Sequence, residues 1–369
     1  MAIVYKIDLP TDKILCAYNN NVIRFNSDST ETPISAVIEF NGLTVTLYPN
    51  PAGFFYFNFK DYITGLINTD NFKDDAELLL PTATPCVDWT SKVFLYSSID
   101  ITINLANETT DTDNVPVNWL ANMFQLDNKG TIPSTLPKIL HEDSVLTFYP
   151  NLPFDVTILT PQTGDEYYFT NIDNSLSLTI EPPHGQVNRL IISDGDLEYA
   201  LFDLGLNNFE LTSDKIGSGD GATVSIIRKP ITCFKGIYIK WDNGMSGWNY
   251  HYFESWRKDQ TTKDTFELNN DFDNLEDTLS KVIQGGKTGF NKIVTKQEFT
   301  TNENKAGFLT LFTSPKIYLY TGTYGQQTQV TDWLEVSLTP STITLNSSHK
   351  NQSTYNLTFE LPPLDTRTV

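Results

Sequence analysis

The sequence has few of the residues from which metal sites, disulfide frameworks and catalytic centres are built. Its three cysteines, Cys16, Cys86 and Cys233, lie far apart and show neither Cys-x-x-Cys nor histidine-paired spacing. We therefore expect buried or incidental thiols rather than structural zinc or disulfide bridges. The four histidines are scattered, and the common hydrolase motifs Gly-x-Ser-x-Gly and His-Glu-x-x-His do not occur. The sequence thus indicates no catalytic residue, metal or cofactor.

Positive charge and long apolar runs are also scarce. Lys and Arg number 25 against 45 Asp and Glu, which gives a formal net charge of −20, and no basic cluster is present. This composition disfavours binding to nucleic acid and to anionic membrane surfaces, because both need clustered cations. No apolar run approaches membrane-spanning length, and Met1–Pro10 lacks the pattern of a secretory signal. We expect synthesis and folding in the cytosol, with no membrane insertion.

What the chain does have is aromatic residues with strand-like spacing. The 23 Phe and 17 Tyr favour strands, and Asn, Thr, Ser and Asp punctuate short alternating runs. The length predicts two or three domains of about 100–200 residues each. We expect a mostly β protein of tandem antiparallel β-sandwich domains with a few short helices. The expected domains are a β-sandwich over 1–140, a second β-sandwich over 141–262, and a helix with a small β domain over 263–369.

Several local patterns support this organisation. Asn41-Gly42 between two alternating runs predicts a tight hairpin. Helical spacing predicts short helices over 60–67 and 116–124, and a capped helix over 273–284 before Gly285-Gly286. The polar stretch from Asp127 to Glu142 indicates a domain boundary. Strands of the second domain are expected at 145–149, 154–159, 166–170, 176–180, 189–192, 197–202, 223–227 and 237–241.

The segment Ile237–Phe253 reads as two aromatic strands joined by a turn at Asp242-Asn243-Gly244, with Gly247 as a second permissive point. We interpret it as the core-forming hairpin of the second domain. An alternative use of its rings is a stacking surface for a glycan, because aromatic faces suit the C–H groups of sugars. That candidate surface consists of Trp241, Trp248, Tyr250, Tyr252 and Trp256.

Two kinds of acidic site remain as lesser alternatives. Calcium ligands could come from Asp194 with Asp196, from Asp214 with Asp220, or from Asp271 with Asp273, but none fits an EF-hand loop. A glycosidase would need two carboxylates across a cleft, and the sequence places no such pair. The run Gly217–Gly221 lacks the features of a phosphate loop and is expected to be a plain loop.

The hairpin also carries a family resemblance. Lys240-Trp241-Asp242-Asn243, leading through Gly244 and Gly247 into Trp248–Phe253, resembles a motif in virion structural proteins of tailed bacteriophages that infect Bacteroidetes hosts. The early segments Val22–Phe25, Pro51–Phe54 and Asp61–Leu66, and the late segment Thr313–Leu319, are similar too. This chain has Met-Ser-Gly where the related proteins often carry Gly-Gly.

The resemblance implies a non-enzymatic tail, collar or neck component of a virion, and it transfers no catalytic residues. The implied partners are further copies of the chain and neighbouring virion proteins, held through sheet edges in a symmetric oligomer. The implied localisation is the virion, assembled in the host cytoplasm. A receptor- or glycan-binding module on the particle surface, with a host surface glycan as partner, is the alternative function.

Overall fold

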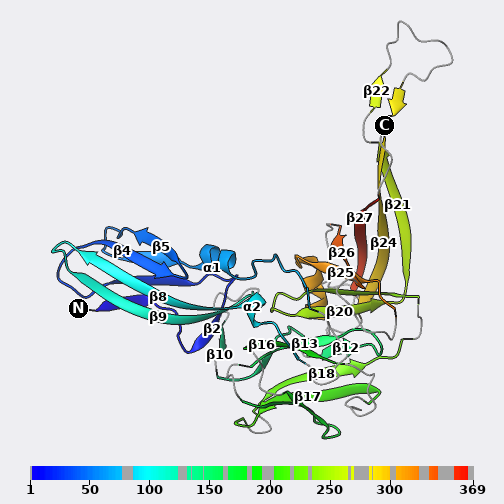
Figure 1. The fold of residues 1–369 in the computed structure, drawn as a ribbon, viewed down its shortest axis with the longest axis horizontal. Helices are drawn as coiled ribbons and strands as arrows, with labels where there is room; N and C mark the ends of the chain where they lie inside the picture. Colours follow the sequence, from blue (N-terminus) through cyan, green and yellow to red (C-terminus); the bar gives the residue numbers. More distant parts are fainter. Residues whose placement is uncertain are drawn as a thin grey trace.

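The computed structural model shows three β domains joined at one place, with two of them extending away from the junction (Figure 1). Helices are few and short, as the composition predicts. The structure describes the following residues: 2–76, 86–123, 131–133, 135–143, 145–160, 165–180, 185–192, 203–216, 220–231, 235–264, 267–269, 282–284, 286–299, 305–323, 332–339 and 353–364.

The N-terminal domain is a sandwich of a three-stranded sheet, β1-β3-β6, and a six-stranded sheet, β10-β2-β9-β8-β4-β5. Helix α1 (Lys60–Leu66) follows β6 at the end of the domain nearest the junction, as Figure 1 shows. The strands are β1 (Ile3–Ile7), β2 (Lys13–Cys16), β3 (Val22–Ser27), β4 (Pro33–Phe40), β5 (Leu43–Leu47), β6 (Phe55–Asn58), β8 (Phe94–Leu105), β9 (Thr110–Leu120) and β10 (Thr131–Pro133).

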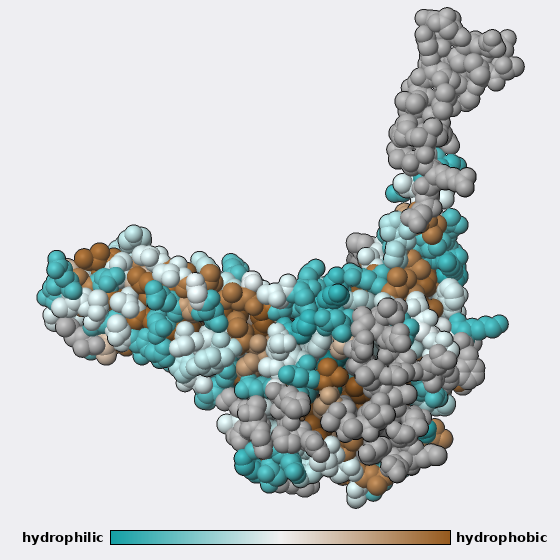
Figure 2. All heavy atoms as spheres, in the orientation of Figure 1, coloured by the Kyte–Doolittle hydropathy of each residue, from teal (hydrophilic) through white to brown (hydrophobic). Residues whose placement is uncertain are grey.

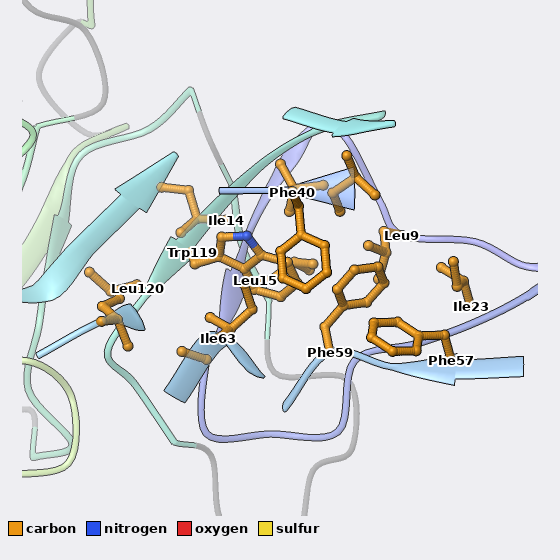
Figure 3. Close-up of a cluster of buried hydrophobic side chains, with 14 of the residues drawn as sticks. Leu9, Ile14, Leu15, Ile23, Phe40, Phe57, Phe59, Ile63, Trp119 and Leu120 are labelled. Carbon is orange, nitrogen blue, oxygen red and sulfur yellow. The ribbon is translucent and has the colours of Figure 1, made fainter. Parts of the chain in front are cut away.

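Aromatic and aliphatic side chains from both sheets fill this first core (Figure 3). Phe40, Phe57 and Phe59 meet edge to face, with ring centroids 4.7–6.2 Å apart. Trp119 is fully buried and donates from Nε1 to Ser97 Oγ at 2.9 Å, which satisfies its one polar atom. The alternating pattern of the sequence thus produces a closed apolar interior. Figure 2 shows apolar surface along the same domain.

The two local signals in this region are confirmed. Asn41 and Gly42 adopt φ angles of 45° and 79° between β4 and β5, as a two-residue hairpin turn requires. The helix expected over 60–67 is α1. Both the turn and the helix are determined by residues close together in the chain, and such local features are the ones that a sequence predicts best.

The helix expected over 116–124 is wrong. Residues up to Leu120 form β9, which pairs with β8 from Asn104 opposite Thr110 to Phe94 opposite Leu120. Val117 and Trp119 point into the core with period two, and this burial outweighs the helical cue from Pro116. Pro116 is tolerated because the parallel neighbour β2 begins pairing only at Asn118.

The central domain packs a four-stranded sheet, β11-β13-β16-β7, against a five-stranded sheet, β12-β18-β17-β14-β15. Two short elements precede it: β7 (Cys86–Asp88), which lies early in the chain yet pairs with β16, and α2 (Thr90–Val93). The other strands are β11 (Lys138–Ile139), β12 (Val145–Phe148), β13 (Asp155–Leu159), β14 (Tyr167–Asn171), β15 (Ser177–Ile180), β16 (Val187–Ile191), β17 (Gly205–Ser213) and β18 (Ala222–Arg228).

Most strands expected for this domain are present. The expected strand at 197–202 lies outside the described residues, and β17 was not expected because its Asn207-Asn208 pair disfavours a strand. The boundary expected between Asp127 and Glu142 is consistent with the pairing, since β10 pairs with β2 of the first domain and β11 pairs with β13 of the second.

The third domain is built on one seven-stranded sheet, β20-β19-β25-β26-β27-β24-β21, and a small hairpin of β22 and β23. Figure 1 shows its long strands running away from the central domain. The elements are β19 (Ile237–Asp242), β20 (Trp248–Phe253), β21 (Trp256–Asp264), β22 (Glu267–Asn269), β23 (Val282–Gln284), β24 (Lys287–Phe299), α3 (Lys305–Leu309), a 3-10 turn (Thr310–Phe312), β25 (Ile317–Tyr320), β26 (Trp333–Leu338) and β27 (Ser353–Leu364).

This sheet changes two expectations about the third domain. Residues 282–284, expected to be helical, form strand β23, and residues 273–281 of the expected helix lie outside the described part of the chain. The boundary expected at 262/263 cuts through β21, which pairs with β24 as far as Asp264 opposite Lys287. The sheets therefore divide between Arg228 and Ile237, so that the aromatic hairpin belongs with the third domain.

Candidate functional site

The aromatic hairpin forms a wall between two hydrophobic cores. β19 pairs with β20 on one side and with β25 on the other, so it is held within the seven-stranded sheet. Tyr238, Trp248, Tyr250 and Tyr252 pack into the core of the central domain. Ile237, Ile239, Trp241 and Phe253 pack into the core of the third domain. The expectation of a core-forming hairpin is met, and the hairpin serves both domains at once.

The turn of this hairpin contacts the other two domains. Gly244 takes a φ of 72°, as expected, and its carbonyl accepts the Met123 backbone N–H at 2.9 Å from the end of the first domain. Asn243 donates from Nδ2 to the Leu140 carbonyl at 3.1 Å and accepts the Met245 N–H at 2.8 Å. The buried Met245 side chain belongs to the N-terminal core. The turn therefore ties the third domain to both neighbours.

Gly247 does not supply the left-handed backbone conformation expected of it. The second left-handed residue of the turn is Ser246, with a φ of 66°, and Gly247 is required for space instead. A Cβ at Gly247 would lie 2.8 Å from Thr157 Oγ1 and 3.0 Å from Thr157 Cβ. Glycine here lets the hairpin backbone lie directly against β13.

Beside the turn, four buried charges from all three parts of the chain form one cluster. Arg189 of β16 binds Asp155 of β13 through two hydrogen bonds of 2.8 Å, and its Nη1 donates to Asp74 Oδ1 at 2.6 Å. Lys240 of β19 forms an ion pair with the other oxygen of Asp74, which belongs to the segment after α1. Tyr250 of β20 donates its hydroxyl to Asp155. We call these four charged residues the junction cluster.

The junction cluster is fully enclosed and balanced in charge. The side chains of Arg189, Asp74 and Asp155 have no exposed area, and that of Lys240 is 1% exposed. Burial alone would raise the pKa of Asp74, but the charges of Arg189 and Lys240 outweigh it and hold that pKa well below its usual range. Two carboxylates thus neutralise two cations within the protein interior.

Aromatic rings surround these charges and contact the two cations. The Arg189 guanidinium lies 4.9 Å from the ring centroid of Trp89, and Lys240 Nζ lies 4.1 Å from that of Trp333. Tyr318 accepts the Asp74 backbone N–H at 3.3 Å. Ring faces attract desolvated cations, so the same residues exclude water and offset part of the desolvation cost.

The residues proposed from the sequence as a glycan surface are mostly interior. Trp241, Trp248, Tyr250 and Tyr252 are only 2–8% exposed, whereas Trp256 is 40% exposed and donates from Nε1 to the Lys235 carbonyl at 2.6 Å. These five rings therefore form no open platform. The burial follows from the position of the hairpin between two cores, which local sequence could not reveal.

The junction cluster was missed by sequence reasoning, although a weak signal exists. Arg189 and Lys240 each lie within a strand whose residues are all buried, and each is the only cation of its strand. A lone cation in such a strand indicates a buried partner, since an unpaired charge there would be prohibitively costly. The sequence does not say which carboxylate supplies that partner.

Other candidate sites gain no support from the geometry. Within the ranges that the structure describes, no group of three His, Cys, Asp or Glu side chains is placed to hold a metal ion. Asp194, Asp196, Asp271, Asp273 and Cys233 lie outside those ranges. Cys16 is buried and Cys86 is half-buried. No helix in the described residues is long and apolar enough to cross a membrane.

Comparison with known proteins gives only a general likeness. No family model and no curated protein matches the chain. Among solved structures, a tetra-tandem repeat from the extending region of a large adhesion protein is 9% identical with a TM-score of 0.24, over 98% of this chain and 73% of that one. The fibronectin(III)-like modules of Clostridium thermocellum CbhA are 8% identical with a TM-score of 0.20, over 62% and 94% of the two chains.

A third similar structure is SGBP-B of the Bacteroides ovatus mixed-linkage glucan utilization locus, in complex with a mixed-linkage heptasaccharide. It is 8% identical with a TM-score of 0.20, over 64% of this chain and 46% of that one. Scores this low carry no argument about function. The fold itself, tandem β domains in an extended chain, rests on the strand pairing described above.

Proposed function

We propose that this chain is a non-enzymatic structural component of a tailed-phage virion, placed in the tail or neck, where it holds itself and neighbouring virion proteins in position. The observation that carries the proposal is the junction cluster together with the hairpin turn. These contacts fasten three β domains at one buried place, as a load-transmitting connector requires. The resemblance of the hairpin sequence to phage virion proteins supplies the biological setting.

The edge strands of the sheets supply surfaces for assembly. β5, β15 and β21 are the outer strands of their sheets, and the side chains of β21 are mostly exposed and charged. Charged edge strands avoid indiscriminate pairing yet leave backbone groups for a specific partner. The net charge of −20 keeps separate copies soluble until a partner of suitable shape is met.

The test is the oligomeric state and the location of the protein. We expect size-exclusion chromatography with light scattering to show a symmetric oligomer, or a complex with a co-expressed neighbouring virion protein. Antibody labelling of intact particles in electron micrographs should place the protein at the tail or neck. A chain that stays monomeric at high concentration and is absent from purified particles would refute the proposal.

The alternative of a glycan-binding module on the particle surface no longer has the flat aromatic platform that suggested it. Sugar binding by this protein would need a site other than an exposed aromatic platform.

A further inference from the structure

A polar cavity of about 240 Å³ lies next to the junction cluster, where the central and third domains meet. Its walls come from β12, β13, β19, β20, β24 and α3, together with residues that connect these elements. Trp241, Trp248 and Tyr250 line it together with Phe308, so three of the rings proposed from the sequence as a sugar platform border an enclosed pocket. At ~30 Å³ per water molecule, the space holds about eight waters.

The cavity borders one end of the seven-stranded sheet and has an accessible mouth. β20 is an end strand of this sheet, and among the strands that the structure describes it pairs only with β19. Lys229 and Glu298 are exposed lining residues and mark the opening, whereas Trp241 and Trp248 are buried and mark the floor. A small solute can therefore enter from solvent and meet aromatic side chains inside.

Hydrogen-bonding groups inside the cavity are held in fixed orientations. His251 Nε2 lies 2.8 Å from Gln297 Oε1, and Gln297 Nε2 donates to the Glu298 carbonyl, which fixes the amide. His141 Nδ1 accepts the Asp143 N–H at 3.0 Å, which leaves its ring proton on Nε2. Burial lowers the pKa of both imidazoles to about 4, so both are neutral at pH 7. Asn249 donates to the Gly307 carbonyl at 2.9 Å, while its Oδ1 makes no hydrogen bond of ordinary geometry.

The charges that line the cavity nearly cancel. Asp155 is matched by Arg189 in the junction cluster, and Glu298 is paired with Lys296 at 2.8 Å. Asp143 and Lys229 remain, with one charge of each sign. Neither an anion nor a cation gains a net attraction from such a lining, whereas a neutral ligand with several hydroxyl groups meets both donors and acceptors.

We propose that this cavity binds one neutral sugar ring, such as the terminal hexose of a glycan. The aromatic side chains that line the cavity suit the apolar C–H groups of a pyranose, and the amides and imidazoles suit its hydroxyls. The size admits a single ring. This function goes beyond the structural role and does not depend on it, because binding is measured on the isolated protein.

The experiment is a saturation-transfer NMR titration of the full chain with six neutral sugars: glucose, galactose, mannose, rhamnose, fucose and N-acetylglucosamine. Glucuronate and glucosamine serve as charged probes of similar size. We expect saturable binding of at least one neutral sugar, and weaker binding of both charged probes. Absence of saturable binding by every neutral sugar at about 10 mM, ten times a Kd of 1 mM, would overturn the proposal, as would a preference for a charged probe.

Variants locate the binding. Thr147→Trp on β12 fills the cavity from a half-buried lining position, and the same change at the exposed Thr46 on β5 is the matched control. We expect at least tenfold weaker binding in Thr147→Trp and none of this loss in Thr46→Trp. Gln297→Ala removes the fixed amide, should weaken binding similarly, and decides the matter if Thr147→Trp fails to fold. Unchanged affinity in a folded cavity variant would place the sugar elsewhere and refute the assignment.

Discussion

Asp74 and Lys240 form a buried ion pair although 166 positions separate them in the chain. Asp74 follows helix α1 of the first domain, and Lys240 lies in β19, the first strand of the aromatic hairpin. Arg189 of the central domain holds the other oxygen of Asp74, so one carboxylate joins three parts of the protein. Such a pair adds little net stability compared with apolar packing, but it strongly penalises any arrangement that separates the partners.

Loss of the Asp74 charge should therefore reduce the free energy of unfolding far more than loss of the Asp75 charge. Asp74→Asn leaves Arg189 and Lys240 with one buried carboxylate between them, and we expect a cost of about 3–5 kcal/mol in the free energy of unfolding. The matched control is Asp75→Asn, because Asp75 pairs with Lys92 at 2.9 Å on the surface and should lose under about 1 kcal/mol. Urea denaturation measures both. Equal losses in the two variants would contradict the role of the junction cluster.

Two tryptophans of the candidate glycan surface, Trp248 and Trp256, should also differ in their effect on stability. Trp248 is 4% exposed within the central core, so Trp248→Ala should cost about 3–5 kcal/mol. Trp256 is 40% exposed with one hydrogen bond to Lys235, so Trp256→Ala should cost about 1 kcal/mol. Thermal and urea unfolding of both variants provide the measurement. A mild effect at Trp248 would mean that its ring faces solvent after all.

Sequence predicted those parts of this fold whose causes are local. Asn41-Gly42 makes its turn from its own backbone preferences, and the alternation in β4 and β5 needs only one buried face. Pro116 misled the prediction because burial of Trp119 outweighed a weak helical cue. The hairpin was predicted as a hairpin. Its placement in the seven-stranded sheet of the third domain, however, depends on β25, some 70 residues further along the chain.

The candidate site was less predictable for a related physical reason. A buried charge is tolerated only where distant partners converge, and nothing near Lys240 in the sequence points to Asp74. The cavity similarly depends on residues from six separate elements, β12, β13, β19, β20, β24 and α3. The aromatic residues were correctly singled out, while their exposure could be known only from the packing of two domains against one hairpin.

Because the hairpin packs closely against β13, substitutions at Gly247 and Thr157 should have non-additive effects on the free energy of unfolding. Gly247→Ala places a methyl group 2.8 Å from Thr157 Oγ1, and we expect a loss of about 1–3 kcal/mol from overpacking. Thr157 Oγ1 is buried without a hydrogen-bond partner, so Thr157→Ala removes the closer of the two contacts with Thr157, that with Oγ1, without breaking a hydrogen bond. The double variant should be more stable than the sum of the single effects predicts, by about 1 kcal/mol. Strict additivity in a double-mutant cycle would argue against this contact.

The carboxyl of Asp242 should make folding stability depend on pH. Burial raises its pKa to about 7, against the opposing effect of the hydrogen bond that Oδ1 accepts from Gly244 at 2.9 Å. Below about pH 4 the carboxyl is protonated in both the folded and unfolded states. Between about pH 4 and 7 it ionises only when unfolded, so the wild-type protein loses stability as the pH rises through this window.

Asp242→Asn isolates that contribution, because the amide keeps an oxygen for the Gly244 N–H and cannot ionise. We expect the variant to be more stable than the wild type above pH 7 by at least about 1 kcal/mol, since each pKa unit is worth 1.36 kcal/mol. The difference should vanish near pH 4. His141 and His251, whose lowered pKa values act in the opposite direction, are present in both proteins and cancel in the comparison. Urea denaturation at several pH values measures the two profiles, with Asp259→Asn on the exposed β21 as the control. Parallel profiles for Asp242→Asn and wild type would show that this carboxyl is ionised in the folded protein.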